Sequence, residues 1–200
     1  MVEQTAPLVE AVTGLALPDT VVVRTTTARQ WQAAHRRQDK GRLRAEGREL
    51  RPSRSSRRDA KAEVTALRKD RRIIWPTIGA EVVEDRQGRP ELVILAQAMR
   101  EAGRLNDEPT LHKIIAHEMT HLAQHTASNG SIWQLMHTLY PNERGIANRN
   151  YNFLVEGHAY WADQQITTKL LGAPVPTGEI SPTPHSATGP WPKPAGVRRP

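Results

Sequence analysis

The stretch NDEPTLHKIIAHEMTHLAQHTASNG, residues 106 to 130, predicts one amphipathic helix and contains an HExxH motif. Asn106 or Asp107 can cap its first turn, Pro109 suits an early helical position, and Asn129-Gly130 is a stop signal. Its apolar residues fall in an arc of about 80° and should face the core. These residues are Leu111, Ile115, Met119 and Leu122.

The motif consists of His117, Glu118 and His121, with two residues between the glutamate and the second histidine. Helical positions i and i+4 are about 40° apart around the axis and about 6 Å apart along it. Two imidazoles at that spacing can bind one tetrahedral Zn²⁺, with the glutamate beside the metal-bound water. The pattern predicts a zinc site; the alternative is a solvated helix that carries two histidines by coincidence.

A third ligand is expected, because catalytic zinc takes three protein ligands and one water. The candidates that follow His121 are His125, His137, Glu143, Glu156, His158 and Asp163. His125 lies about 12 Å along the helix axis from His117, too far for both to reach one metal. We therefore expect His125 at the surface or at the rim of a cleft.

Glu156 is the better candidate and lies on a second predicted helix, residues 151 to 171. Tyr160 and Asp163 share its helical face, whereas His158 points to the other side and is a poor ligand. Asp163 is expected to accept a hydrogen bond from the distal nitrogen of a ligating histidine. The alternative for this face is a polar stripe exposed to solvent.

The motif HEMTH (117–121), followed by LVEGHA (154–159), resembles the gluzincin clan of zinc metallopeptidases. Thermolysin belongs to this clan, and its small single-domain members are called minigluzincins. The resemblance covers roughly residues 73 to 171. It implies that His117, His121 and Glu156 bind zinc and that Glu118 is the general base. It also implies that the strand at 91–96 forms the edge of the substrate cleft.

The chain departs from this pattern at Tyr160, where many gluzincins have an acidic residue. Asp163, one turn further on, is the candidate substitute. Two related patterns fit less well. The long metzincin motif would need a glycine where Gln124 stands and a histidine where Ala127 stands. Residues 129–136 are similar to SprT-like proteases of DNA–protein crosslinks, but these would place a ligand histidine at Asn129.

The predicted function is zinc-dependent hydrolysis of peptide bonds in a peptide or protein substrate. Zinc lowers the pKa of its bound water to about 7, and Glu118 takes the water proton and passes it to the leaving amine. Candidates for stabilising the oxyanion are Tyr160, Tyr151, His158 and His185, and Tyr160 is favoured by its helical face. One alternative is a zincin-fold protein that binds zinc but is latent or inactive. Another is a SprT-like protease that acts on proteins bound to nucleic acid.

Composition predicts a small core and a soluble, cytoplasmic protein. Hydrophobic residues make up 38% of the chain, with a single phenylalanine. The absence of cysteine excludes disulfides, thiolate metal sites and a cysteine nucleophile. No signal peptide and no run of 18 apolar residues is visible, so no membrane association is expected.

The positive charge is concentrated in one segment. Residues 35–72 contain 15 Lys or Arg against 6 Asp or Glu, a balance of +9 within a chain of net charge +7. We expect two helical pieces there, broken around Gly41, Gly47, Pro52 and the serines at 53–56. The segment either binds nucleic acid weakly or forms a solvated, charged helix pair.

These signals predict an α+β, zincin-like fold. A small twisted, mainly antiparallel sheet should pack on the HExxH helix and on the second ligand-bearing helix. One zincin-like domain, residues 1–172, is expected to include the basic helical insertion, and a proline-rich extended tail to follow at 173–200. The other predicted elements are a strand at 20–24, a helix capped by Thr27, an extended stretch from Ile73, a β-hairpin of 81–84 with 91–96, and a short helix at 132–140.

Overall fold

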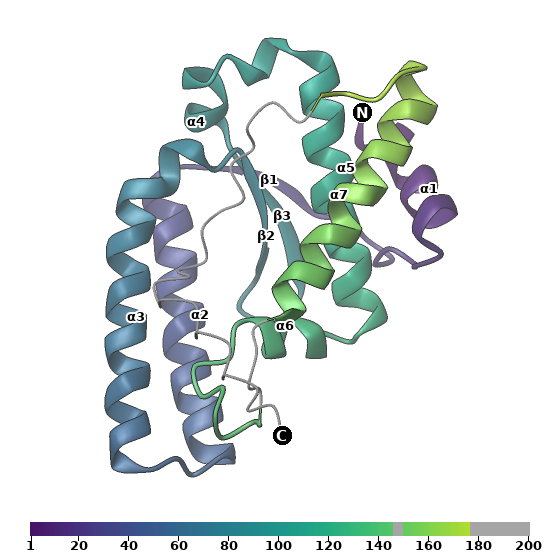
Figure 1. Cartoon of the computed structure of the whole chain (residues 1–200). Coiled ribbons are helices and arrows are strands. Elements are labelled where there is room, and N and C mark those ends of the chain that lie inside the picture. Colours follow the sequence, from purple (N-terminus) through teal and green to yellow (C-terminus); the bar gives the residue numbers. More distant parts are fainter. Residues whose placement is uncertain (146–149, 177–200) are drawn as a thin grey trace, which may run out of the picture.

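A three-stranded mixed sheet lies between two layers of helices in the computed structural model, which gives the chain an α+β fold (Figure 1). The structure describes residues 1–145 and 150–176, with side chains of the last helix from residue 153 onward. The elements are α1 (Val2–Thr13), β1 (Val23–Thr26), α2 (Ala28–Glu49), α3 (Arg54–Ile74), η1 (Trp75–Thr77), β2 (Ala80–Glu84), β3 (Pro90–Leu95), α4 (Ala96–Glu101), η2 (Arg104–Asn106), α5 (Glu108–Ala127), α6 (Ser131–Met136) and α7 (Asn150–Leu171).

The sheet has the strand order β1-β3-β2. β2 and β3 form the predicted antiparallel hairpin, with Ala80 opposite Ile94. β1 pairs with β3 in parallel, so the expectation of a mainly antiparallel sheet is wrong. The connection from β1 to β3 runs through α2, α3 and β2, and two parallel strands require a long connection of this kind.

The strand order also corrects the expectation about the cleft edge. β3 is the central strand and is paired on both sides, so the stretch 91–96 offers no free edge to a peptide. The free edge on the hairpin side of the sheet belongs to β2.

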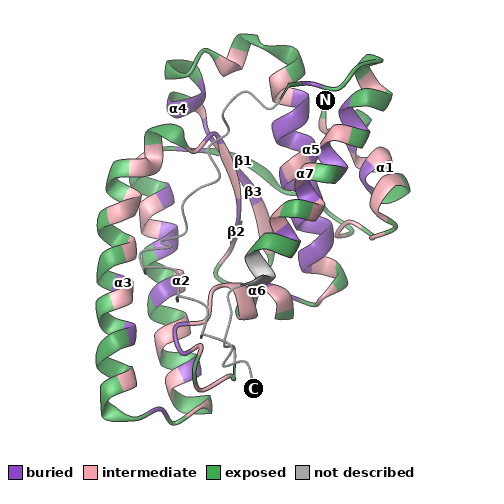
Figure 2. Ribbon diagram, viewed as in Figure 1, coloured by how far each residue is buried: buried purple, intermediate pink, exposed green. Residues whose placement is uncertain are grey.

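Each strand of the hairpin contributes to two cores, because successive side chains point to opposite faces. Val82 and Leu92 pack with apolar residues of α1, α5 and α7. Val83 and Val93 pack with Trp31 of α2 on the other face. Figure 2 shows the buried stripes of the helices turned toward the sheet. The sheet therefore holds α5 and α7 on one side and the basic α2–α3 hairpin on the other.

The basic segment forms two long helices. Thr27 caps α2 with the expected capping box, in which its hydroxyl accepts a hydrogen bond from the Gln30 amide. Gly41 and Gly47 lie inside the helix and do not break it; the break is at Arg51–Ser53, where Arg51 has φ of 46°. The stretch from Ile73 was expected to be extended, but it finishes α3 and continues into η1.

Two N-terminal features differ from the sequence prediction. α1, which was not predicted, packs against α5 and α7 through the fully buried Val9. The first strand is at 23–26, three residues later than predicted at its start.

The proline-rich extended tail was predicted at residues 173–200. Of that tail, the structure describes residues 173–176, and Val175 is buried among them. The rest of the predicted tail lies outside the described residues. No described helix combines the length and apolar character needed to span a bilayer.

Candidate metal centre

The helix α5 presents the HExxH motif with the predicted boundaries. The Asp107 carboxylate caps it by accepting a hydrogen bond from the Thr110 amide. Its C-terminal end turns at Asn129 and Gly130, which have φ of 48° and 74°. Met119 and Leu122 are fully buried, so the core-facing side of α5 is fixed by apolar packing. The motif histidines are thereby turned toward α7.

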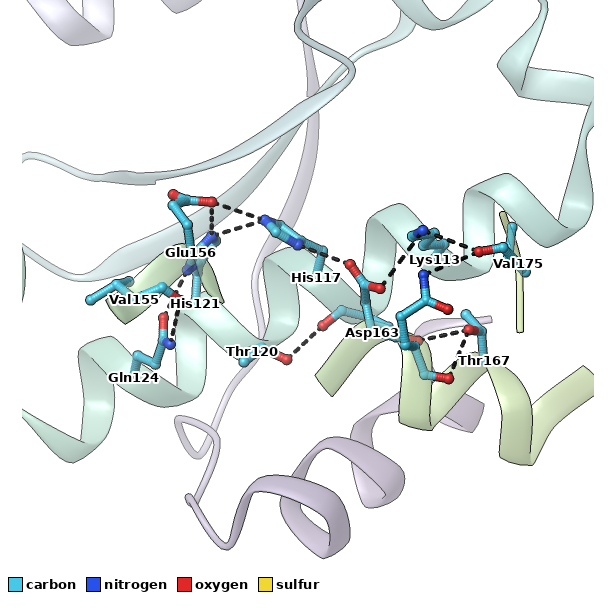
Figure 3. Close-up of polar contacts among 12 residues, drawn as sticks. Lys113, His117, Thr120, His121, Gln124, Val155, Glu156, Asp163, Thr167 and Val175 are labelled. Atoms are coloured by element: carbon cyan, nitrogen blue, oxygen red, sulfur yellow. Dashed lines mark hydrogen bonds and ion pairs between the residues drawn. The ribbon is translucent and has the colours of Figure 1, made fainter. Parts of the chain in front are cut away.

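His117, His121 and Glu156 converge on one point, as Figure 3 shows. The Nε2 atoms of the two histidines are 3.2 Å apart. Glu156 Oε2 lies 3.3 Å from Nε2 of His117 and 3.6 Å from Nε2 of His121. One oxygen and two nitrogens from two helices therefore form a compact triangle of potential ligand atoms.

This triangle fits a tetrahedral metal. Atoms bound about 2.0–2.1 Å from one tetrahedral Zn²⁺ lie about 3.3–3.4 Å from one another. The three observed separations are close to that value. Two imidazoles and a carboxylate are also a donor set that catalytic zinc uses, with the fourth position left for water. The residues present therefore suit such an ion in both chemistry and spacing.

Asp163 lies behind His117, as the sequence predicted. Its Oδ2 is 3.1 Å from His117 Nδ1, so the Nδ1–H donates to the carboxylate and Nε2 is the nitrogen turned toward the triangle. The Asp163 side chain is fully buried, and its Oδ1 makes no hydrogen bond within the described residues. The buried ammonium of Lys113 lies 4.0 Å from that oxygen and supplies the nearest positive charge.

Gln124 holds the second histidine, a role that sequence reasoning missed. Its Oε1 accepts a hydrogen bond from His121 Nδ1 at 2.8 Å, which leaves the Nε2 of His121 as the metal-facing acceptor. Its amide nitrogen donates to the Val155 carbonyl of α7 and to Nδ1 of His158. The available signal was the i+3 spacing from His121, which places Gln124 on the same helical face.

The electrostatics of the triangle favour a bound cation. Burial lowers the pKa of His117, but hydrogen bonds with Asp163 and Glu156 outweigh it and raise the pKa to about 10. Burial raises the pKa of Glu156, but hydrogen bonds from His117 and His121 outweigh it and hold that pKa well below its ordinary value. The site therefore stabilises positive charge at the point where the three acceptors meet.

Glu118 and Tyr160 border the triangle. Glu118 is buried, and burial raises its pKa although the two motif histidines lower it in part. The Tyr160 ring lies 4.7 Å from the His117 ring, centroid to centroid. Burial and then the charge of Glu156 raise the pKa of its hydroxyl, so the hydroxyl keeps its proton at neutral pH.

The other candidate ligands lie elsewhere. His125 does not join the triangle, but it is buried, so its expected place at the surface or a cleft rim is wrong. Its Nε2 lies 3.2 Å from Glu84 Oε1 of β2, within hydrogen-bond distance, so this buried ring nitrogen has a partner. His158 bonds to Gln124 and stacks on Trp161, and His137 packs against Trp133. Glu143 is also outside the triangle.

Three further positions were named from the sequence. Asn129 lies in the turn that follows α5 and is not part of the triangle, which leaves the SprT-like pattern without its third ligand. The side chain of Tyr151 and the whole of His185 lie outside the described residues.

Comparison of the chain with family models, curated proteins and solved structures gave no match. The interpretation of the site therefore rests on its own residues and distances.

Proposed function

We propose that this protein is a zinc-dependent metallopeptidase with a zincin-like, gluzincin-type active site. The observation that supports it most is the triangle of His117, His121 and Glu156, whose atoms are spaced as zinc ligands are. A bound zinc ion would supply Lewis acidity, which polarises the scissile carbonyl and makes water acidic at neutral pH.

Glu118 is the proposed general base. It follows a ligand on α5 but points about 100° away from it around the helix, so its carboxylate is left for proton transfer. Its raised pKa brings it closer to neutral, where a carboxylate is a more effective proton acceptor. Glu118 would accept a proton from the attacking water and deliver it to the leaving amine.

The neighbouring side chains hold this arrangement in place. Asp163 and Gln124 fix the orientation of the two imidazoles through their Nδ1 atoms. Tyr160, protonated and beside His117, is the proposed hydrogen-bond donor to the oxyanion.

The edge of β2 favours an extended peptide as substrate. The backbone bonds Leu95 N–H to Gly79 O and Asp85 N–H to Arg89 O show that odd-numbered residues of this strand pair with β3. The backbone groups of Ala80 and Val82 therefore point away from β3 and are placed to pair with an added strand. The edge strand lies against the helix that carries the proposed base, since Val82 of β2 packs in one core with Met119 of α5.

The test compares the zinc-loaded wild type with Glu118→Gln on a broad peptide pool. The variant should keep its zinc and its melting temperature and lose on the order of 10² to 10⁴ in rate, the usual value of general-base catalysis. Glu101→Gln, which changes an exposed carboxylate of α4, is the matched control and should behave as the wild type. Equal activity of wild type and Glu118→Gln would refute the base assignment. A zinc-loaded wild type that cleaves no peptide would overturn the proposal.

A further inference from the structure

The α2–α3 hairpin separates its charges by sign between its inner and outer faces. Thirteen of the 15 Lys and Arg residues at 35–72 are exposed. Of the 6 acidic residues in the same range, only Glu49 and Asp59 are exposed, while Asp39 and Glu46 are buried. The outer surface of the hairpin is therefore more positive than the sequence balance of +9 indicates.

Buried and half-buried charges form a row of contacts along the inner face of α2, which we call the ionic seam: Asp39, Arg42 and Glu46 with Arg71, Glu84 and Arg144. Arg71 Nη1 lies 2.7 Å from Asp39 Oδ2, and Arg42 Nη2 lies 3.7 Å from Glu84 Oε2 of β2. Arg144 Nη2 is 4.0 Å from Glu46. The seam attaches the hairpin to the rest of the fold and keeps two acidic side chains away from the outer face.

The outward cations of α3 lie along one stripe. At about 100° per residue they fall within an arc of about 120°, and at about 1.5 Å per residue they extend over about 27 Å. They are Arg54, Arg57, Arg58, Lys61, Arg68, Lys69 and Arg72. On α2, exposed cations recur at a spacing of four residues: Arg36, Lys40, Arg44 and Arg48. The outer faces of both helices are exposed along their length (Figure 2).

We propose that this outer face binds double-stranded nucleic acid through its phosphate backbone, without reading its sequence. A duplex carries about one negative charge per 1.7 Å of axis, so about 27 Å of duplex carries about 16 phosphates beside the seven cations of the stripe. The two surfaces are complementary in charge, because the long positive face of the hairpin would lie against the long negative phosphate backbone.

The other residues of the face favour a duplex over two rival polyanions. Between residues 28 and 74 the only aromatic ring of Trp, Tyr or Phe is that of Trp31, which is buried, so no such ring is available for stacking unpaired bases. The only large hydrophobic side chain exposed in that range is Ile73, which gives little to insert into a membrane. The surface is separate from the metal centre, and the proposal stands whether or not that centre is catalytic.

The experiment measures fluorescence anisotropy of a labelled 24-base-pair DNA duplex between about 50 and 200 mM salt. The variant combines Arg54→Gln, Lys61→Gln and Arg68→Gln on the stripe. The matched control combines Arg86→Gln, Arg100→Gln and Lys169→Gln, three exposed cations outside the hairpin, and changes the net charge equally. Circular dichroism establishes that all three proteins are folded.

The wild type should bind, with log K falling linearly as log salt rises. Losing three phosphate contacts should flatten that slope by about 2.7 and weaken binding at about 50 mM salt on the order of tenfold or more. The control should keep the wild-type slope. Absence of binding at about 50 mM salt, or equal loss in variant and control, would overturn the proposal. Tighter binding of a single strand, or of phosphatidylserine vesicles, than of the duplex would also overturn it.

Discussion

The candidate metal centre and the ionic seam are both clusters of largely buried polar side chains, but their charges are balanced differently. In the seam, cations and anions alternate, with Arg71 against Asp39 and Arg42 against Glu84. In the metal centre, three acceptor atoms are turned toward one another. Buried acceptors that face a common point are stabilised only by a shared positive charge. The seam supplies its own cations, whereas the metal centre calls for a proton or a metal ion.

The largest expected effect is loss of the metal from ligand variants. His117→Ala and His121→Ala should each lower zinc from about one per chain to none, because two remaining ligands hold zinc poorly. His125→Ala should retain zinc, although it removes a buried side chain that contacts Glu84. Elemental analysis of purified protein measures the difference. If the double alanine variant of His117 and His121 retained zinc, these histidines would not be the ligands, and the contrast between the candidate metal centre and the ionic seam would fail.

The second-largest expected effect is a loss of stability when a charge of the ionic seam is removed. Asp39→Ala leaves Arg71 without its carboxylate partner and should lower the free energy of unfolding by about 2–4 kcal/mol. Asp59→Ala, on the exposed side of α3, should change it by less than about 0.5 kcal/mol. Urea denaturation of both variants gives the numbers, and zinc content should stay that of the wild type. A similar loss from both variants would show that the seam does not stabilise the fold.

A smaller effect is expected at the carboxylate behind His117. Asp163→Asn keeps the shape but weakens the hold on Nδ1, so zinc affinity should fall about 10- to 100-fold. Competition with a chelator of known affinity measures this change. An unaltered zinc affinity would mean that Asp163 contributes to core packing and does not orient His117.

The smallest effect is a change in pH dependence at Glu46. Burial raises the pKa of this carboxyl, although hydrogen bonds from the Leu139 amide and the Thr138 hydroxyl lower it in part. The folded state therefore holds the Glu46 proton more tightly than the unfolded state does. The resulting stabilisation is complete below the unfolded pKa, about 4.3, and is lost as pH rises through the folded pKa.

Glu46→Gln has no such proton to lose. Across that pH range, the free energy of unfolding of the wild type should fall relative to that of the variant. Denaturation curves recorded from acid to neutral pH test the sign. A difference that is constant with pH would show that the folded protein does not raise this pKa.

The parts of the site that sequence predicted are those set by local geometry. The i, i+4 spacing brings His117 and His121 together on any helix, and the helical face shared with Glu156 predicted the contact of Asp163 with His117. Gln124 was missed because its role depends on a carbonyl of α7 that no local pattern reveals.

The fold was predictable to a similar extent. Caps and turn signals placed the start of α2, the helix α5 and the β2–β3 hairpin. The parallel pairing of β1 was missed, because it depends on where a crossover of two helices returns the chain. The ionic seam was missed as well, because charged residues are expected at the surface from sequence alone. Only tertiary packing shows that one face of α2 is turned inward.

One contact also determines where this protein can be shortened. The Lys113 ammonium is buried beside Asp163, and it donates to the Val175 carbonyl at 3.1 Å. A chain cut after Gly172 would lose that acceptor and leave a desolvated ammonium directly behind the carboxylate that holds His117. A cut after Pro176 keeps the contact. Residues 173–176 therefore supply the hydrogen-bond acceptor for a buried ammonium behind the candidate metal centre, and a shortened protein should retain them.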